Sequence, residues 1–313
     1  MGLYVNQKAY KEVESFLPTE YHYTKDYHPT EEFWDWRGNQ VHLDTFRNSK
    51  AKAKIILFHG VGTNGRQISM ILGGPLAKDG FETITVDMPT YGETVVAKDQ
   101  IISYDDWVQC GSDLIDAELK KDDRPIFLYG LSAGGMETYH VAAKNKKVKG
   151  IIGMTFLNQS DKTVQMTTTN NWFWGTFGTA LTGIAVKMGL INFKMKMSIP
   201  SKMRALVNDK DCLKVMLDDK TSAENKVSMK FMNTYMTYIP EMQPEDFDVC
   251  PVLLTQPDAD KWSPQFCSDP FLDRINKVPV TKTTLRNGSH YPIEATALTD
   301  LHKYALEFIN KNV

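Results

Sequence analysis

Short apolar runs of strand length alternate with longer amphipathic stretches along most of the chain. The amphipathic stretches repeat apolar positions every three or four residues, which predicts helices. Nearly uninterrupted apolar runs predict strands buried on both faces. Such strands alternating with helices predict a parallel sheet covered by helices on each side. The predicted strands are 52–60, 81–89, 124–130 and 148–157, and the predicted helices between them are 66–80, 103–121 and 134–146.

Both ends of the chain extend this pattern. Residues 9–17 predict a short amphipathic helix, and residues 33–46 predict two strands joined at the turn Arg37-Gly38-Asn39. Ser103 followed by Asp106 forms a capping box, which predicts where the helix 103–121 begins. The alternation resumes near the end with predicted strands at 250–260 and 278–288 and a helix at 299–311.

Residues 160–245 interrupt the alternation with helical stretches and most of the fifteen methionines. We therefore predict an α/β core formed by residues 1–159 and 246–313, with residues 160–245 as a helical cap inserted after the sixth strand. The stretch 172–191 has one charge, Lys187, and is long enough to span a membrane. Because it lies between two halves of one sheet, it predicts a buried or interfacial cap helix instead.

Composition narrows the class of protein. The 313 residues are 42% hydrophobic and 24% charged, as in globular proteins, and the net charge of −2 gives no basic field for nucleic acid. The N-terminus lacks an apolar segment behind a basic start, so we expect a cytoplasmic protein. Four cysteines without CxxC spacing predict free thiols, and no metal or cofactor is expected. They are Cys110, Cys212, Cys250 and Cys267.

A candidate nucleophile lies at the junction of a predicted strand and a predicted helix. Gly130-Leu131-Ser132-Ala133-Gly134 has the G-x-S-x-G pattern of a nucleophile elbow. A serine in such a sharp turn brings its neighbours two residues away against the adjoining strand and helix, where glycine avoids a collision. The turn would present the Ser132 hydroxyl at the carboxyl edge of the sheet.

A serine nucleophile needs a base, an orienting acid and two N–H donors for the oxyanion. His290 follows the predicted strand 278–288 and is the expected base, whereas His302 lies inside the last helix. The expected donors are the N–H groups of Ala133 and of Val61, in the loop after strand 52–60, with His59 shaping that loop. The acid is open between residues that follow strands, namely Asp258, Asp260 and Asp161.

These segments resemble the α/β-hydrolase superfamily and, within it, the monoacylglycerol lipase and lysophospholipase group of serine hydrolases. The matching stretches are "LFHGVGTNGR", "VDMPTYGET", "YGLSAGG", "LLTQPDADKWSP" and "NGSHYPIE". The resemblance implies a mostly parallel central sheet, Asp260 as the acid, His290 as the base, and Val61 and Ala133 as oxyanion donors. Two positions depart from the family pattern: Leu131 where histidine or glutamate is frequent, and Thr90 where a glycine is usual.

The expected function is that of a serine carboxylic-ester hydrolase, esterase or lipase-like, with an acyl-enzyme on Ser132. The apolar cap, including Trp172 and Phe177, is expected to bind an apolar acyl chain and to contact a lipid surface transiently. The expected partner is a small-molecule ester or lipid. An acyl thioesterase or acyltransferase with the same triad, or a non-catalytic ligand-binding protein, are the alternatives, and the oligomeric state stays open.

Overall fold

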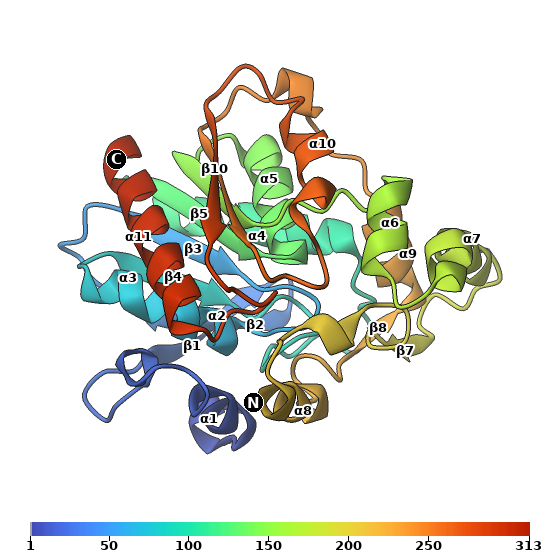
Figure 1. The fold of residues 1–313 in the computed structure, drawn as a ribbon, viewed down its shortest axis with the longest axis horizontal. Helices are drawn as coiled ribbons and strands as arrows, with labels where there is room; N and C mark the ends of the chain where they lie inside the picture. Colours follow the sequence, from blue (N-terminus) through green and yellow to red (C-terminus); the bar gives the residue numbers. More distant parts are fainter. Residues whose placement is uncertain (1) are drawn as a thin grey trace.

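The computed structural model describes residues 2–313 and contains one eight-stranded sheet in the order β1-β2-β4-β3-β5-β6-β9-β10 (Figure 1). Strand β2 is antiparallel to both its neighbours, and all pairs from β4 to β10 are parallel. The strands are β1 (Thr30–Trp36), β2 (Asn39–Phe46), β3 (Lys54–Phe58), β4 (Glu82–Val86), β5 (Ile126–Leu131), β6 (Gly150–Met154), β9 (Val252–Pro257) and β10 (Val280–Leu285).

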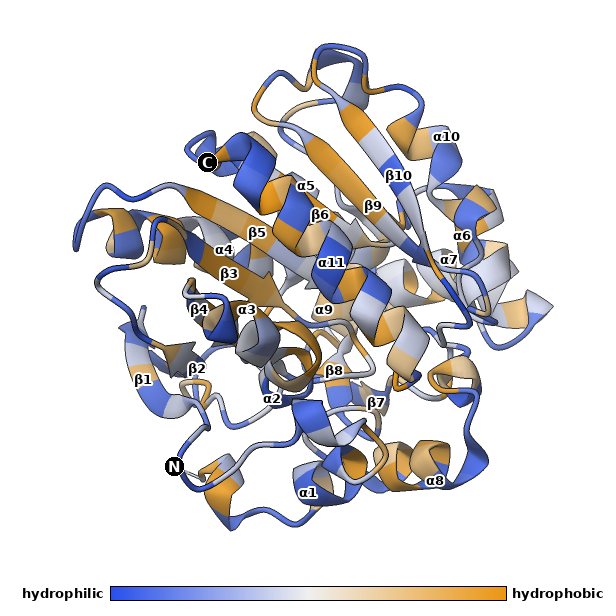
Figure 2. Ribbon diagram, turned by 60° about the vertical axis from the view of Figure 1, so that its left-hand side comes forward, coloured by the Kyte–Doolittle hydropathy of each residue, from blue (hydrophilic) through white to orange (hydrophobic). Residues whose placement is uncertain are grey.

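Helices cover both faces of this sheet, as the sequence predicts. Helices α3 and α11 lie on one face, and α4 and α5 lie on the other (Figure 2). Every residue of β3, β4, β5, β6 and β9 is buried between them. The helices of the core are α1 (Ala9–Glu14), α2 (Gly65–Ile68), α3 (Gly74–Lys78), α4 (Tyr104–Leu119), α5 (Ala133–Asn145), α10 (Asp269–Leu272) and α11 (Ala295–Asn312).

Two of the predicted helices match the structure to different degrees. Helix α4 begins after Ser103, and the predicted capping box with Asp106 is formed and therefore confirmed. The helix predicted over 66–80 is present over residues 65–78, but it is not regular, because a π-helical turn over Ser69–Gly73 joins α2 to α3. Pro75 has no N–H to donate to the carbonyl of residue 71, so the regular hydrogen-bond pattern is interrupted where this turn meets α3.

The segment between β6 and β9 forms a cap beside the carboxyl edge of the sheet (Figure 1). The prediction of a purely helical cap is wrong in one detail, because two three-residue strands pair within it. Strands this short carry no readable alternation of apolar and polar positions. The cap elements are α6 (Lys162–Thr168), α7 (Trp172–Lys187), β7 (Lys194–Lys196), α8 (Lys210–Asp218), β8 (Lys226–Ser228) and α9 (Met229–Thr237). None of the helices in residues 2–313 has the length and apolar character needed to cross a bilayer.

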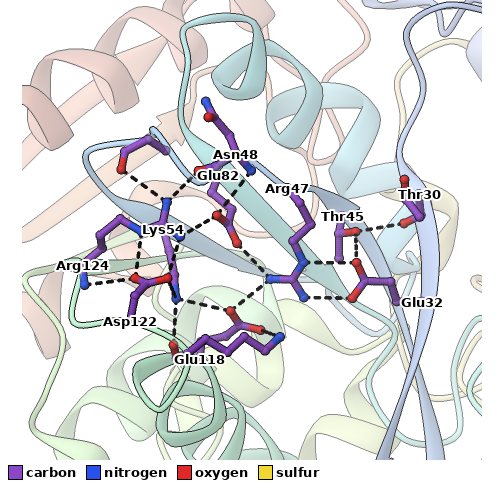
Figure 3. Close-up of polar contacts among 12 residues, drawn as sticks. Thr30, Glu32, Thr45, Arg47, Asn48, Lys54, Glu82, Glu118, Asp122 and Arg124 are labelled. Carbon is purple, nitrogen blue, oxygen red and sulfur yellow. Dashed lines mark hydrogen bonds and ion pairs between the residues drawn. The ribbon is translucent and has the colours of Figure 1, made fainter.

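An ion-pair network holds the opposite, amino edge of the sheet (Figure 3). Lys54 at the start of β3 is fully buried, and its Nζ lies 2.7 Å from the carbonyl of Glu118 and 3.0 Å from Asp122. Arg47 and Arg124 both bind Glu82 at the start of β4. Because three parallel strands begin at this network, it fixes their relative positions far from the carboxyl edge.

Candidate active site

Ser132 lies in a strained turn between β5 and α5. Its backbone angles, φ 58° and ψ −117°, lie outside the ordinary regions for a residue with a side chain. A Cβ on Gly130 would lie 1.9 Å from the carbonyl oxygen of Gly134, and a Cβ on Gly134 would lie 2.6 Å from the carbonyl oxygen of His59. The two glycines are therefore required because backbone segments touch there, as the G-x-S-x-G pattern predicts.

Asp260 and His290 meet at the carboxyl edge of the sheet. The Nδ1 of His290 lies 2.9 Å from Oδ2 of Asp260, whose Oδ1 accepts the N–H groups of Trp262 and Ser263. Burial alone would raise the pKa of Asp260, but the charge and hydrogen bond of His290 lower it below its ordinary value. Asp260 is therefore an ionised acceptor that fixes the proton of His290 on Nδ1.

The other two candidate acids lie elsewhere. Asp258 is exposed at the end of β9. Asp161 caps α6, where its side chain accepts the N–H groups of Thr163 and Val164. Of the three acids that follow strands, only Asp260 contacts His290 among the described residues. His302, the other late histidine, contacts Asp79 instead.

His290 presents its second nitrogen toward a buried space. The Nε2 atom is buried and has no hydrogen-bond partner among residues 2–313. The imidazole packs on the ring of Trp262, with 4.7 Å between centroids. Trp262 and Ser132 line the same cavity, so the free nitrogen and the elbow hydroxyl belong to one region of the carboxyl edge.

Ser263 is a site residue that the sequence analysis missed. Its hydroxyl donates to Oδ2 of Asp260 at 2.9 Å and lies 2.9 Å from Nδ1 of His290. Ser263 thus contacts both members of the acid–histidine pair. The sequence did contain a signal for this contact. An aspartate in a turn often accepts the backbone N–H of a residue two or three positions later, which places a serine at that position beside the carboxylate.

The two predicted oxyanion donors lie next to Ser132. Val61 lines the same cavity, and Ala133 is the first residue of α5, where backbone N–H groups have no partner within the helix. In the described part of the chain, neither N–H donates a hydrogen bond. His59 donates from Nδ1 to the carbonyl of Gly60, and its Nε2 accepts the N–H of Met88. Burial lowers the pKa of His59, so this neutral imidazole shapes the loop.

A buried histidine supports the loop that carries Val61. Asp87 accepts the N–H of Gly65, where this loop enters α2, at 2.7 Å, and it also contacts Nδ1 of His42 at 2.9 Å. The Nε2 of His42 lies 2.9 Å from Glu31. Burial alone would lower the pKa of His42, but the bonds and charges of Asp87 and Glu31 raise it to about 10. His42 is therefore a cation bound between two carboxylates.

Arg66 completes this network. Its guanidinium binds Asp44 through Nε and Nη2 and lies 3.3 Å from Glu31. The ligand atoms of Glu31, His42 and Asp44 lie within 4.8 Å of one another, a spacing compatible with a metal ion. Both imidazole nitrogens are already engaged with carboxylates, and Arg66 supplies the neighbouring positive charge, so we interpret the cluster as an ion-pair network.

The loop after β4 departs from the family pattern and is held by the cap. Thr90 adopts φ 86°, a conformation that is costly for a β-branched residue. Its carbonyl accepts the side-chain amide of Asn225 at 2.8 Å, and the N–H of Gly92 donates to the carbonyl of Thr221. Tyr91 in the same loop donates its hydroxyl to the carbonyl of Val61. Cap residues thus brace the two loops around Ser132.

The space beside Ser132 measures about 650 Å³ when the open solvent at its mouth is included. Its wall is largely apolar and comes mostly from the cap. The apolar lining includes Leu157, Trp174, Met197, Phe231, Met232 and Met236. No charged side chain among the described residues lines it. Uncharged polar groups come from residues such as Gln159 and Tyr235.

Trp172 and Phe177, which we predicted to bind substrate, do not line this cavity. They lie on the outer face of α7, where they are 66% and 43% exposed. The inner face of the same helix carries Trp174 and Gly178, which do line the cavity. The sequence showed an apolar helix without showing which of its two apolar faces turns inward.

Comparisons with known proteins identify the fold. Residues 49–294 match the family described as serine aminopeptidase, S33. No curated protein matches the chain. A soluble variant of the monoglyceride lipase from Saccharomyces cerevisiae, solved with a substrate analog, superposes with a TM-score of 0.75 at 13% identity, over 93% of this chain and 98% of that chain.

Two further structures show the same fold. The monoacylglycerol lipase from Paleococcus ferrophilus has a TM-score of 0.66 at 18% identity, over 88% of this chain and 100% of that chain. A carboxylesterase from Bacillus subtilis has a TM-score of 0.62 at 14% identity, over 97% of each chain. The predicted α/β-hydrolase fold is confirmed.

Gly130→Ala is expected to destabilise the protein by about 3 kcal/mol, because the new methyl group would overlap the carbonyl of Gly134. The matched control is Gly183→Ala on α7, where a Cβ meets only the side-chain amide of Asn233 at 3.5 Å. The free energy of unfolding of that variant is expected to rise by about 0.5–1 kcal/mol, because alanine has a higher helix propensity than glycine. Urea unfolding measures both, and equal stability of the two variants would contradict the elbow geometry.

The pH dependence of stability is expected to report His42. Its folded pKa of about 10 exceeds the ordinary value of 6.5, so its contribution is complete below pH 6.5 and is lost as pH rises toward 10. We expect a loss on the order of 3–5 kcal/mol over this interval. The slope between pH 7 and 8, below the range in which the four buried thiols titrate in the unfolded chain, should largely vanish in His42→Asn. It should persist in the control His28→Asn, whose side chain is exposed. Urea unfolding at several pH values measures this, and an unchanged slope in His42→Asn would refute the assignment.

Proposed function

The chain belongs to the serine aminopeptidase, S33, family of α/β hydrolases, and on that basis we propose that it hydrolyses carboxylic esters with an apolar acyl chain through an acyl-enzyme on Ser132. The observation that carries the proposal is the uncharged, largely apolar cavity with Ser132 in its wall. The Asp260–His290 pair at the same edge of the sheet supplies a base for that hydroxyl.

In the proposed first step, Nε2 of His290 takes the proton of Ser132 while Oγ attacks the ester carbonyl carbon. The N–H groups of Val61 and Ala133 stabilise the negative oxygen of the tetrahedral intermediate. The imidazolium of His290 then protonates the leaving alcohol, and the acyl group stays on Ser132. Asp260 keeps its negative charge and stabilises the imidazolium.

In the second step, water attacks the acyl-enzyme and gives its proton to Nε2 of His290. The intermediate collapses, the carboxylic acid leaves, and Ser132 recovers its proton. Ser263 would act as a positioning residue, since its hydroxyl holds Oδ2 of Asp260 beside Nδ1 of His290.

The cavity favours an ester over the amino-terminal peptide that the family description suggests. An aminopeptidase must bind the ammonium group of its substrate, and a buried ammonium requires an acidic partner. No acidic side chain lines the cavity among the described residues. Methionines at positions such as 232 and 236 have flexible side chains that can adapt to acyl chains of different shape.

We expect hydrolysis of p-nitrophenyl esters to rise with acyl length from acetate to about octanoate, because the apolar wall gains contact with each methylene. Ser132→Ala should lose at least a thousandfold in kcat, whereas binding of a decanoate analogue should persist. Alanine p-nitroanilide should be a poor substrate. A flat profile from acetate to decanoate would refute the apolar-chain preference, and undiminished turnover by Ser132→Ala would refute the mechanism. Faster cleavage of matched thioesters would favour the thioesterase alternative.

Gly178→Phe is expected to shorten the chain that the cavity accepts. A Cβ at this position meets only Met236 at 3.4 Å and Trp174 at 3.9 Å, both cavity residues, so a ring there would occupy acyl space. KM for p-nitrophenyl octanoate should rise at least tenfold, whereas KM for p-nitrophenyl acetate should change less than twofold. Gly183→Phe, on the same helix but outside the cavity lining, is the control. Equal effects of the two variants would contradict this placement.

A further inference from the structure

Helix α7 exposes a stripe of large apolar side chains along its whole length. The stripe follows helical spacing, and none of its residues lines the cavity, to which α7 contributes Trp174 and Gly178 instead. Its residues are Phe173 (43% exposed), Phe177 (43%), Leu181 (39%), Ile184 (54%) and Met188 (70%), with Trp172 (66%) at the start. Leu190 and Phe193, which follow the helix, are also exposed. An apolar surface of this extent marks an interaction site.

Along the sequence, the segment that carries the stripe has charges of one sign, although its Lys196 pairs with Glu224 from outside the segment. Residues 162–208 contain six basic side chains and no acidic one, although the whole chain has a net charge of −2. Lys187, in the last turn of α7, and Lys194, in β7, are both exposed and form no ion pair within residues 2–313. The basic residues of this segment are Lys162, Lys187, Lys194, Lys196, Lys202 and Arg204.

We propose that the outer face of α7 docks on an anionic lipid surface, with the apolar stripe among the acyl chains and Lys187 and Lys194 against the headgroups. This inference rests on the proposed function. Docking would bring the acyl cavity beside α7 to the lipid surface, where long-chain esters reside. Figure 1 shows α7 at the periphery of the molecule, away from the sheet, where a flat surface can reach it.

The charge distribution argues against a second copy of this chain as the occupant. Two copies meeting through α7 would bring Lys187 and Lys194 of each copy, which form no ion pair among the described residues, toward the same side chains of the other copy. An anionic bilayer supplies both the apolar phase and the opposite charge. The 16 residues of α7 span about 24 Å, so the whole stripe can lie along the interface.

The test measures binding of the Ser132→Ala protein to sedimented vesicles, so that turnover plays no part. The vesicles are pure phosphatidylcholine or phosphatidylcholine with 30% phosphatidylserine. We expect at least tenfold tighter binding to the anionic vesicles, with the difference shrinking between 50 and 500 mM NaCl as the charges are screened. Equal binding to both vesicle types, or no binding, would overturn the proposal whatever the esterase assay shows.

Paired variants in the same Ser132→Ala background separate the charged and apolar contributions. Lys187→Gln with Lys194→Gln should weaken binding to anionic vesicles by about twenty-five-fold, at roughly fivefold per lysine, and leave binding to neutral vesicles unchanged. Lys50→Gln with Lys120→Gln, at exposed positions near the amino edge of the sheet, is the matched control and should have no effect. Phe177→Ser with Ile184→Ser should weaken binding to both vesicle types.

Sedimentation-velocity analysis of the same proteins completes the test. A monomer at micromolar concentration, unchanged by Phe177→Ser with Ile184→Ser, is the expected result. A dimer that these substitutions dissociate would assign the stripe to a second copy and overturn the lipid assignment. Hydrolysis of soluble p-nitrophenyl butyrate by otherwise wild-type Lys187→Gln, Lys194→Gln protein should equal that of the parent, which separates docking from the chemistry.

Discussion

The close backbone approach at the turn between β5 and α5 is the constraint on which the rest of the site depends. The carbonyl of Gly134 lies where a side chain of residue 130 would begin, and the loop after β3 presses on residue 134. This contact brings Ser132, the start of α5 and the loop of Val61 together without any help from side chains. The acid, the histidine and the cap are then arranged around a point that the backbone already defines.

Two polar networks keep that arrangement from distorting. At the amino edge, buried Lys54 and its carboxylates align the starts of the strands. Near the carboxyl edge, His42 and Arg66 pair with three carboxylates, which ties the N-terminal segment to the start of α2. These are Glu31, Asp44 and Asp87. Removing one partner from either network would leave a buried charge without compensation, which is more costly than losing an exposed pair.

The sequence was sufficient to predict those features that follow from local rules. Burial on both faces made β3 to β6 readable as apolar runs, and the spacing of Gly130, Ser132 and Gly134 predicted the elbow. The acid could not be chosen from the residues alone, because Asp258 and Asp260 both follow β9 and only the folded turn shows which one faces His290. The role of Ser263 and the inward face of α7 depend on tertiary contacts, which periodicity does not encode.

The hydrogen bonds from Asn225 to Thr90 and from Gly92 to Thr221 make the cap an integral part of the scaffold rather than a detachable accessory. Thr90 keeps an unfavourable backbone conformation within this brace. A cap without equivalents of Asn225 and Thr221 would remove the brace and leave the strain, so a functional cap exchange would have to carry the β4 loop along with the cap.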